Sequence, residues 1–136
     1  MRVVLDTNVY VSAALRPGGP TGQLVRLARA GRLQLVASPQ LLAELWDVLR
    51  RPGLESRISS PDARAFVESI RDNSEIRDDV VDPPRVVRDA SDDYLVALAV
   101  AGRVDALVTG DRDLTDLSNP PVVVLTPRQL LDQLSD

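Results

Sequence analysis

Cysteine, histidine and lysine are all absent from this chain of 136 residues. Without cysteine there are no disulfides, no thiolate nucleophile and no cysteine-ligated zinc. Without histidine there is neither the commonest general base nor a Ser-His-Asp triad. Without lysine there is no Schiff base and no P-loop lysine, and all 16 cationic side chains are arginine. Any chemistry must therefore come from carboxylates, hydroxyls, amides, arginine or a bound metal ion.

Long apolar runs are also lacking. None approaches the roughly 20 residues of a membrane span, and the carboxylate of Asp6 comes too early for a signal peptide. The absence of both features predicts a cytoplasmic protein. A length of 136 residues is typical of one domain, so we expect a single domain over residues 1–136. The net charge of −4 argues mildly against a general nucleic-acid-binding surface, although a carboxylate-lined metal site would itself contribute negative charge.

Predicted strands and helices alternate along the chain, which indicates an α/β fold with a mainly parallel sheet. Three helices are expected to begin with a hydroxyl N-cap followed by proline, at Ser38, Ser60 and Thr126, and Gly31 is expected to end an earlier helix. The predicted strands cover residues 2–5, 33–37, 74–81, 106–109 and 122–125. The predicted helices cover residues 21–30, 39–51, 61–72 and 91–101, with a last one from residue 127.

Two aspartates follow predicted strands directly. Asp6 comes after the first strand, and Asp111 comes after the strand at residues 106–109. Sites in open parallel sheets form beyond the carboxyl ends of the strands, so both side chains would enter one crevice if these strands are neighbours. An aspartate in such a place is also a common turn former or helix cap.

Glu44 lies within the predicted helix at residues 39–51. At 100° per residue it falls about 40° beyond the edge of the apolar arc, close to a core that a carboxylate should avoid. No cation occupies positions 40 or 48, which excludes a helical ion pair. The alternative is a solvated residue at the core boundary, whereas Asp47 is predicted to face solvent.

Asp92 and Asp93 open the predicted helix at residues 91–101. Acids in a first turn are favoured by the helix dipole, so one of the two has a simple structural explanation. Asp111 and Asp113 flank Arg112, which would neutralise them in part. Each of these signals is weak by itself.

The convergence of several acids indicates a metal site. Two unit charges 4 Å apart repel by about 4 kcal/mol at an effective dielectric constant of 20. Four converging carboxylates therefore require shifted pKa values or a cation between them. A hard divalent ion, Mg²⁺ or Mn²⁺, is the stable solution, and such ions organise phosphodiester cleavage.

Four segments that contain these acids resemble the PIN-domain family. They are the residues 4–9 (VLDTNV), 38–45 (SPQLLAEL), 92–99 (DDYLVALA) and 107–114 (LVTGDRDL). Each motif is moderately specific, but all four occur in order over nearly the whole chain. The closest resemblance is to the branch of VapC-like ribonucleases, the toxins of prokaryotic type II toxin–antitoxin systems.

The resemblance implies a three-layer α/β/α PIN-like fold and a divalent-metal-dependent endoribonuclease. It also implies Mg²⁺ or Mn²⁺ as cofactor, RNA as substrate, a homodimer and inhibition by a cognate antitoxin protein. The catalytic and metal-binding residues that it implies are Asp6, Glu44, Asp93 and Asp111.

The third of these acids is a choice between two neighbours. Asp93 is chosen over Asp92 because its 18-residue separation from Asp111 suits the helix-then-strand unit of the family. Thr7 and Asn8 match polar positions after the first acid and are expected to orient that acid or a metal-bound water. Asp113 matches a recurrent neighbour of the fourth acid, as a fifth ligand or a supporting residue.

Three other interpretations apply to parts of this sequence. Phosphoryl receivers and haloacid-dehalogenase-like enzymes share the strand-end aspartate, but both depend on a lysine that this chain lacks, and the second group has aspartate where Asn8 stands. A catalytically silent PIN-like module that binds RNA or a partner stays open, because a fold does not define a function. Arginines at residues 50, 51, 57 and 64 form either a phosphate-contacting patch or, as is more usual, a solvated helix face.

Overall fold

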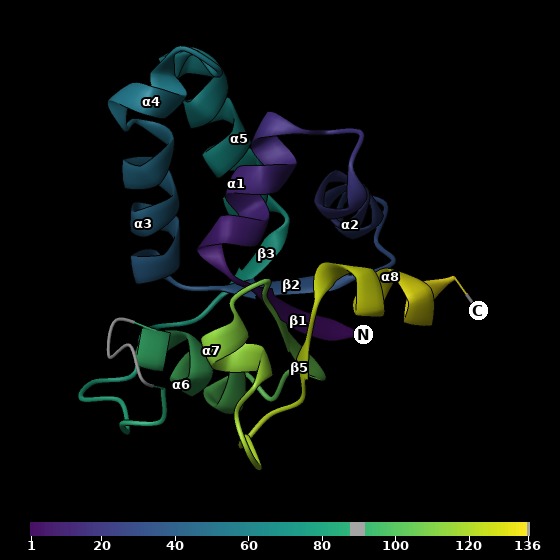
Figure 1. Cartoon of the computed structure of the whole chain (residues 1–136). Helices are drawn as coiled ribbons and strands as arrows, with labels where there is room; N and C mark the ends of the chain where they lie inside the picture. The colour runs from purple at the N-terminus through teal and green to yellow at the C-terminus, as the bar shows by residue number, and fades with distance from the viewer. Residues whose placement is uncertain (88–91, 136) are drawn as a thin grey trace.

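The computed structural model describes residues 1–87 and 92–135 and contains a central sheet of five parallel strands in the order β3-β2-β1-β4-β5 (Figure 1). The predicted α/β fold with a parallel sheet is confirmed. The strands are β1 (Arg2–Leu5), β2 (Gln34–Ala37), β3 (Ser74–Ile76), β4 (Ala106–Val108) and β5 (Val124–Leu125).

Helices cover both faces of this sheet. Figure 1 shows α1, α3 and α5 on one side and α6 on the other, which is the three-layer α/β/α arrangement. The helices are α1 (Thr7–Leu15), α2 (Pro20–Arg29), α3 (Pro39–Leu49), α4 (Pro52–Glu55), α5 (Ser60–Asp72), α6 (Asp93–Ala101), α7 (Arg112–Thr115) and α8 (Pro127–Leu134). In the described residues, no helix is long and apolar enough to cross a membrane.

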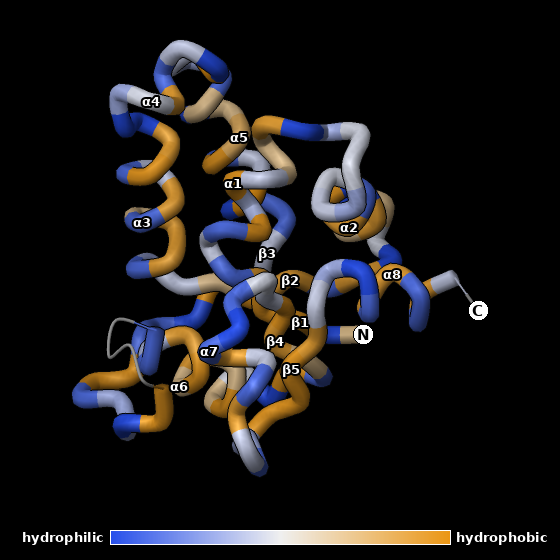
Figure 2. Tube along the Cα trace, viewed as in Figure 1, coloured by the Kyte–Doolittle hydropathy of each residue, from blue (hydrophilic) through white to orange (hydrophobic). Residues whose placement is uncertain are grey.

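The central strands lie in the core because both of their faces are covered. Val3, Val4 and Leu5 of β1 are fully buried, as are all three residues of β4. Figure 2 shows the apolar segments meeting at these strands. A continuous apolar run without alternation is what a strand buried on both faces requires.

The predicted helix ends are largely confirmed. The Ser38 hydroxyl caps α3 by accepting a hydrogen bond from the Leu41 amide, and Thr126 forms a capping box at α8. Gly31 follows α2 with a positive φ of 79°, the conformation that favours glycine. The cap predicted at Ser60 was wrong by one residue, because the Ser59 side chain caps α5.

Helix α1 is the largest element that the sequence pattern does not reveal. Val9, Tyr10 and Ala13 are buried, and the half-buried Val11 and Ala14 also pack on the core, so no polar face marks the helical period. The short helices α4 and α7 were missed as well. Strand β3 ends at Ile76, whereas a strand to residue 81 was expected, and the predicted start of α6 at Ser91 lies outside the described residues.

Candidate active site

The register of the two central strands places Asp6 beside the end of β4. Leu5 pairs with Val108, so that the next residues, Asp6 and Thr109, are neighbours. The Asp6 amide donates to the Val108 carbonyl at 2.9 Å, and the Thr109 hydroxyl donates to Oδ2 of Asp6 at 2.7 Å. Asp6 therefore lies at the carboxyl end of the sheet, between the ends of two adjacent strands.

Asp111 belongs to the same group of residues. Its backbone amide donates to the Thr109 hydroxyl at 3.0 Å, so one threonine hydroxyl contacts the carboxylate of Asp6 and the backbone of Asp111. One carboxylate oxygen of Asp111, Oδ1, accepts the Asp113 amide at 2.9 Å and caps α7. Asp113 itself is exposed. The sequence allowed two interpretations of Asp111, a helix cap or an acid beside Asp6, and the structure shows that it is both.

The electrostatics of Asp6 are those of an uncompensated carboxylate. Burial raises its pKa above the ordinary value; the Thr109 hydroxyl and the amides of Asn8 and Thr7 act in the opposite direction, and the negative charge of Asp111 raises it further. The side chain is only 6% exposed. An ionised Asp6 beside Asp111 therefore favours a cation at this position.

Glu44 reaches this group from α3. Its oxygen Oε2 accepts hydrogen bonds from the Thr7 hydroxyl at 3.1 Å and from the Tyr94 hydroxyl at 2.5 Å. Thr7 is the residue after Asp6, so Glu44 is tied to the end of β1. Glu44 is half-buried and Asp47 is exposed, as the helical arc predicted.

Tyr94 is a site residue that sequence reasoning missed. It lies on α6 and is 5% exposed, and both the carboxylate of Glu44 and the more distant charge of Asp6 act on it. Burial and the hydrogen bond to Glu44 raise its pKa above the ordinary value. The signal was a tyrosine hydroxyl directly after two aspartates in an otherwise apolar helix. Thr109 was missed as well. Its signal was a hydroxyl residue at the end of a predicted strand, two positions before Asp111.

Asp93 is directed elsewhere. Its oxygen Oδ1 accepts the amides of Val86 and Val87 at 2.9 and 2.8 Å, and Arg85 Nε lies 3.1 Å from Oδ2. Burial alone would raise the pKa of Asp93, but the two amides and Arg85 outweigh it and hold the pKa below its ordinary value. Hydrogen bonds to Thr109 connect Asp6 with Asp111, and Glu44 is hydrogen-bonded to Thr7, the residue next to Asp6. The contacts that the structure gives for Asp93 are instead with residues 85–87. Asp92 is half-buried at the N-cap position of α6.

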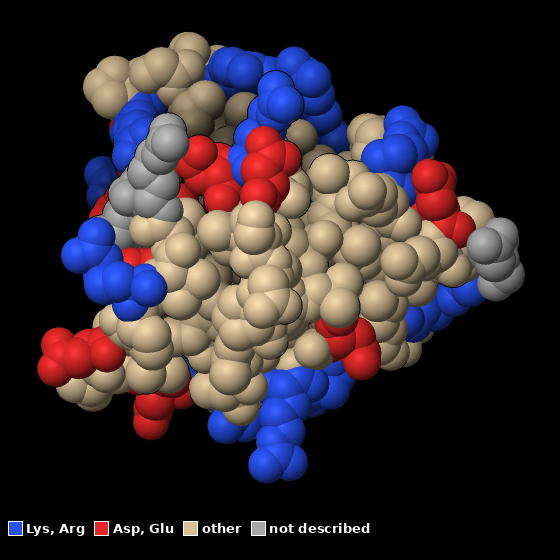
Figure 3. Space-filling view, turned by 60° about the horizontal axis from the view of Figure 1, so that its bottom comes forward, with Lys and Arg blue, Asp and Glu red and all other residues tan. Residues whose placement is uncertain are grey.

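The donor set fits a hard divalent ion in kind, but not as a closed cage. In residues 1–87 and 92–135, no group of three acids lies close enough together to hold a metal ion. Magnesium, however, is usually held by one or two carboxylates and keeps several waters. Asp6 and Asp111 can supply such a pair, with Glu44 acting through water. Figure 3 shows acidic side chains gathered in a hollow of the surface, with arginine side chains beside them.

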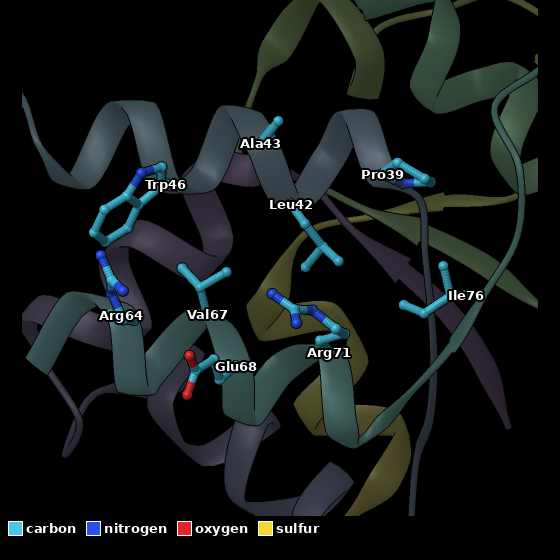
Figure 4. A pocket seen from close by; sticks show the side chains of 9 residues that line it. All are labelled: Pro39, Leu42, Ala43, Trp46, Arg64, Val67, Glu68, Arg71 and Ile76. Atoms are coloured by element: carbon cyan, nitrogen blue, oxygen red, sulfur yellow. The ribbon is translucent and has the colours of Figure 1, made fainter. Parts of the chain in front are cut away.

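A groove between α3 and α5 is separate from the acids. It has a volume of about 530 Å³ and an apolar floor that includes Leu42 and Val67 (Figure 4). Two of the four arginines considered as a phosphate patch, Arg50 and Arg64, lie over the Trp46 ring, 5.1 and 5.5 Å from its centroid. No predicted site acid lines this groove, so it is not where the chemistry is expected.

Comparisons with known proteins define the class. Residues 2–113 match the family model described as PIN domain, and the chain belongs to this family. Proteins with PIN domains are generally nucleases that cleave phosphodiester bonds.

Relatives and structural neighbours agree with this assignment. The chain is 23% identical to the uncharacterized protein MJ1680 of Methanocaldococcus jannaschii, over 98% of this chain and 91% of that protein. VapBC2 from Rickettsia felis, solved with a DNA fragment from its promoter, matches with a TM-score of 0.65 and 18% identity over 93% and 98% of the two chains. PAE2754 from Pyrobaculum aerophilum matches with a TM-score of 0.65 and 17% identity over 99% and 90%. At these identities the two structures support the fold.

Proposed function

We propose that this chain is a divalent-metal-dependent endoribonuclease that hydrolyses RNA phosphodiester bonds, and that it is the toxin of a toxin–antitoxin pair. The observation that carries the proposal is the pair of Asp6 and Asp111 at the ends of adjacent central strands. Within the described residues, no arginine forms an ion pair with Asp6, Glu44 or Asp111. Their negative charge is therefore available to a cation.

Each side chain has a definite task in this proposal. Asp6 and Asp111 hold Mg²⁺ or Mn²⁺, and Thr109 orients Asp6 through its hydrogen bond. Glu44 binds a water of the ion. The ion, when bound, supplies a hydroxide at neutral pH and offsets charge on the phosphate. No lysine or histidine is needed for this chemistry.

Asp93, the third predicted acid, is the least favoured of the four. Oδ1 of Asp93 accepts the amides of Val86 and Val87, which supports a structural task for this residue. Oδ2 lies 3.1 Å from Arg85 Nε but accepts no hydrogen bond from the described residues. Asp92 is the alternative that the sequence leaves for the further acid of the site.

The partners belong to the same proposal. VapBC2 from R. felis is a toxin–antitoxin complex by its name. The structural similarity of this chain to that protein supports a cognate antitoxin as a partner. A homodimer and a cytoplasmic location, both expected from the sequence, go with that assignment. A second candidate function is a PIN-like module that binds RNA without cleaving it. It is favoured by one observation, namely that no three described acids form a metal site.

The test is cleavage of labelled single-stranded RNA with Mn²⁺ or Mg²⁺. Asp6→Asn and Asp111→Asn should each lower the rate by roughly 100-fold or more, because even residues that only support metal ligands are worth 10–100-fold. EDTA should abolish cleavage. Asp47→Asn is the matched control, since Asp47 is an exposed acid on the same helix as Glu44.

Two outcomes decide against the proposal. Cleavage that survives EDTA or both site substitutions contradicts the carboxylate–metal mechanism. RNA that is bound by the wild-type protein but left uncut at millimolar Mn²⁺ establishes the binding module instead.

A further inference from the structure

The Glu44 carboxylate is held by one of its two oxygens. Oε2 accepts both hydroxyl hydrogen bonds, from Thr7 and Tyr94, whereas Oε1 accepts none from the residues that the structure describes. We propose that Tyr94 is a positioning residue that fixes Oε2 of Glu44 and thereby leaves Oε1 for the bound ion or one of its waters. This inference rests on the proposed function.

Tyr94 is better placed for this task than Thr7. Its hydrogen bond is the shorter, 2.5 Å against 3.1 Å, and its ring is packed in the core. The bond joins α6 to α3, two helices on opposite faces of the sheet that lie 50 residues apart in the chain (Figure 1). Glu44 is therefore anchored to the same framework that carries the ends of β1 and β4.

A phenol also suits the chemistry of the site. Tyr94 donates as a neutral group, so it orients Glu44 without cancelling the negative charge that a cation needs. Asp93 shows the contrast, because Arg85 pairs with it directly and offsets its charge. Supporting hydrogen bonds of this kind are typical around metal ligands.

The test compares two tyrosine-to-phenylalanine variants of the full chain. Tyr94→Phe removes only the hydroxyl that contacts Glu44. Tyr10→Phe is the matched control, because Tyr10 is the other tyrosine of the chain, is fully buried, and its hydroxyl has no hydrogen-bond partner among the described residues. Mn²⁺ affinity is measured by calorimetry without RNA. Tyr94→Phe should weaken it by roughly 10-fold, while Tyr10→Phe leaves it unchanged.

A double-mutant cycle separates positioning from general destabilisation. If Tyr94 acts through Glu44, then Tyr94→Phe should have no further effect on Mn²⁺ affinity or on kcat in a Glu44→Gln background. The positioning role is overturned if Tyr94→Phe binds Mn²⁺ as tightly as wild type, or if the effects of the two substitutions are independent. Either result leaves the proposed function in place. A wild-type protein that binds no Mn²⁺ overturns the proposed function and this role with it.

Discussion

Asp6 and Asp93 are both buried carboxylates at the start of a helix, and the protein treats them in opposite ways. Asp93 is 1% exposed and receives two backbone amides and an arginine, which lower its pKa. Asp6 is 6% exposed and faces the like charge of Asp111, and its pKa is raised. A charge that the protein compensates stabilises the fold, whereas one that it leaves uncompensated is available to a ligand.

The sharpest way to break this comparison is Asp93→Asn. We expect it to lower the free energy of unfolding at pH 7 by about 2 kcal/mol, because a buried carboxylate loses charge-assisted hydrogen bonds. Denaturant titration measures the change. Wild-type stability together with lost RNA cleavage would instead make Asp93 a ligand, as the spacing of the sequence suggested.

The pH dependence of this effect has a definite sign. The folded-state pKa of Asp93 lies below its ordinary value of 3.8, so its charge contributes stability above that value. The contribution is lost as the pH falls below 3.8 toward the lower folded-state pKa. The stability difference between wild type and Asp93→Asn should therefore shrink in acid, and a difference that persists unchanged at low pH would exclude a role for the charge.

Asp6→Asn should have the opposite effect on stability. The raised pKa means that ionised Asp6 destabilises the folded protein at neutral pH, and this destabilisation is absent below the ordinary pKa of an aspartate. Asparagine keeps an oxygen for the Thr109 hydroxyl and removes the charge. We expect a gain of about 1 kcal/mol in metal-free protein, measured by thermal unfolding in EDTA. Exposed Asp47→Asn serves as the control, and a loss of stability in Asp6→Asn would contradict the comparison.

The smallest expected effect is that of Arg85→Gln. Arg85 is 74% exposed, so its ion pair with Asp93 is weakened by solvent and contributes about 0.5 kcal/mol. The amides of Val86 and Val87 should carry the rest. Comparing the unfolding of Arg85→Gln with that of Asp93→Asn measures this division directly, and equal losses in both variants would assign the effect to the arginine instead.

The sequence predicted where Asp6, Glu44 and Asp111 lie relative to the strands and helices, because each placement follows from a local rule, and their role at a site stays a prediction. Two are strand-end acids, and one lies at the edge of an apolar arc. The choice of Asp93 rests on sequence spacing and also stays a prediction, because spacing does not determine which way a first-turn side chain turns. The contact that turns it comes from the segment at residues 85–87, whose backbone amides carry no sequence signal.

Composition and period alone determined the α/β class, the parallel sheet and the reliance on carboxylates, because these depend on residue types and on local hydrogen bonding. Only the tertiary structure decided which carboxylates meet and what holds them. The register of β1 against β4 brings Thr109 to Asp6, and packing of α6 opposite α3 brings Tyr94 to Glu44. Such pairings join residues 50 and 103 positions apart, where no local pattern links one side chain to the other.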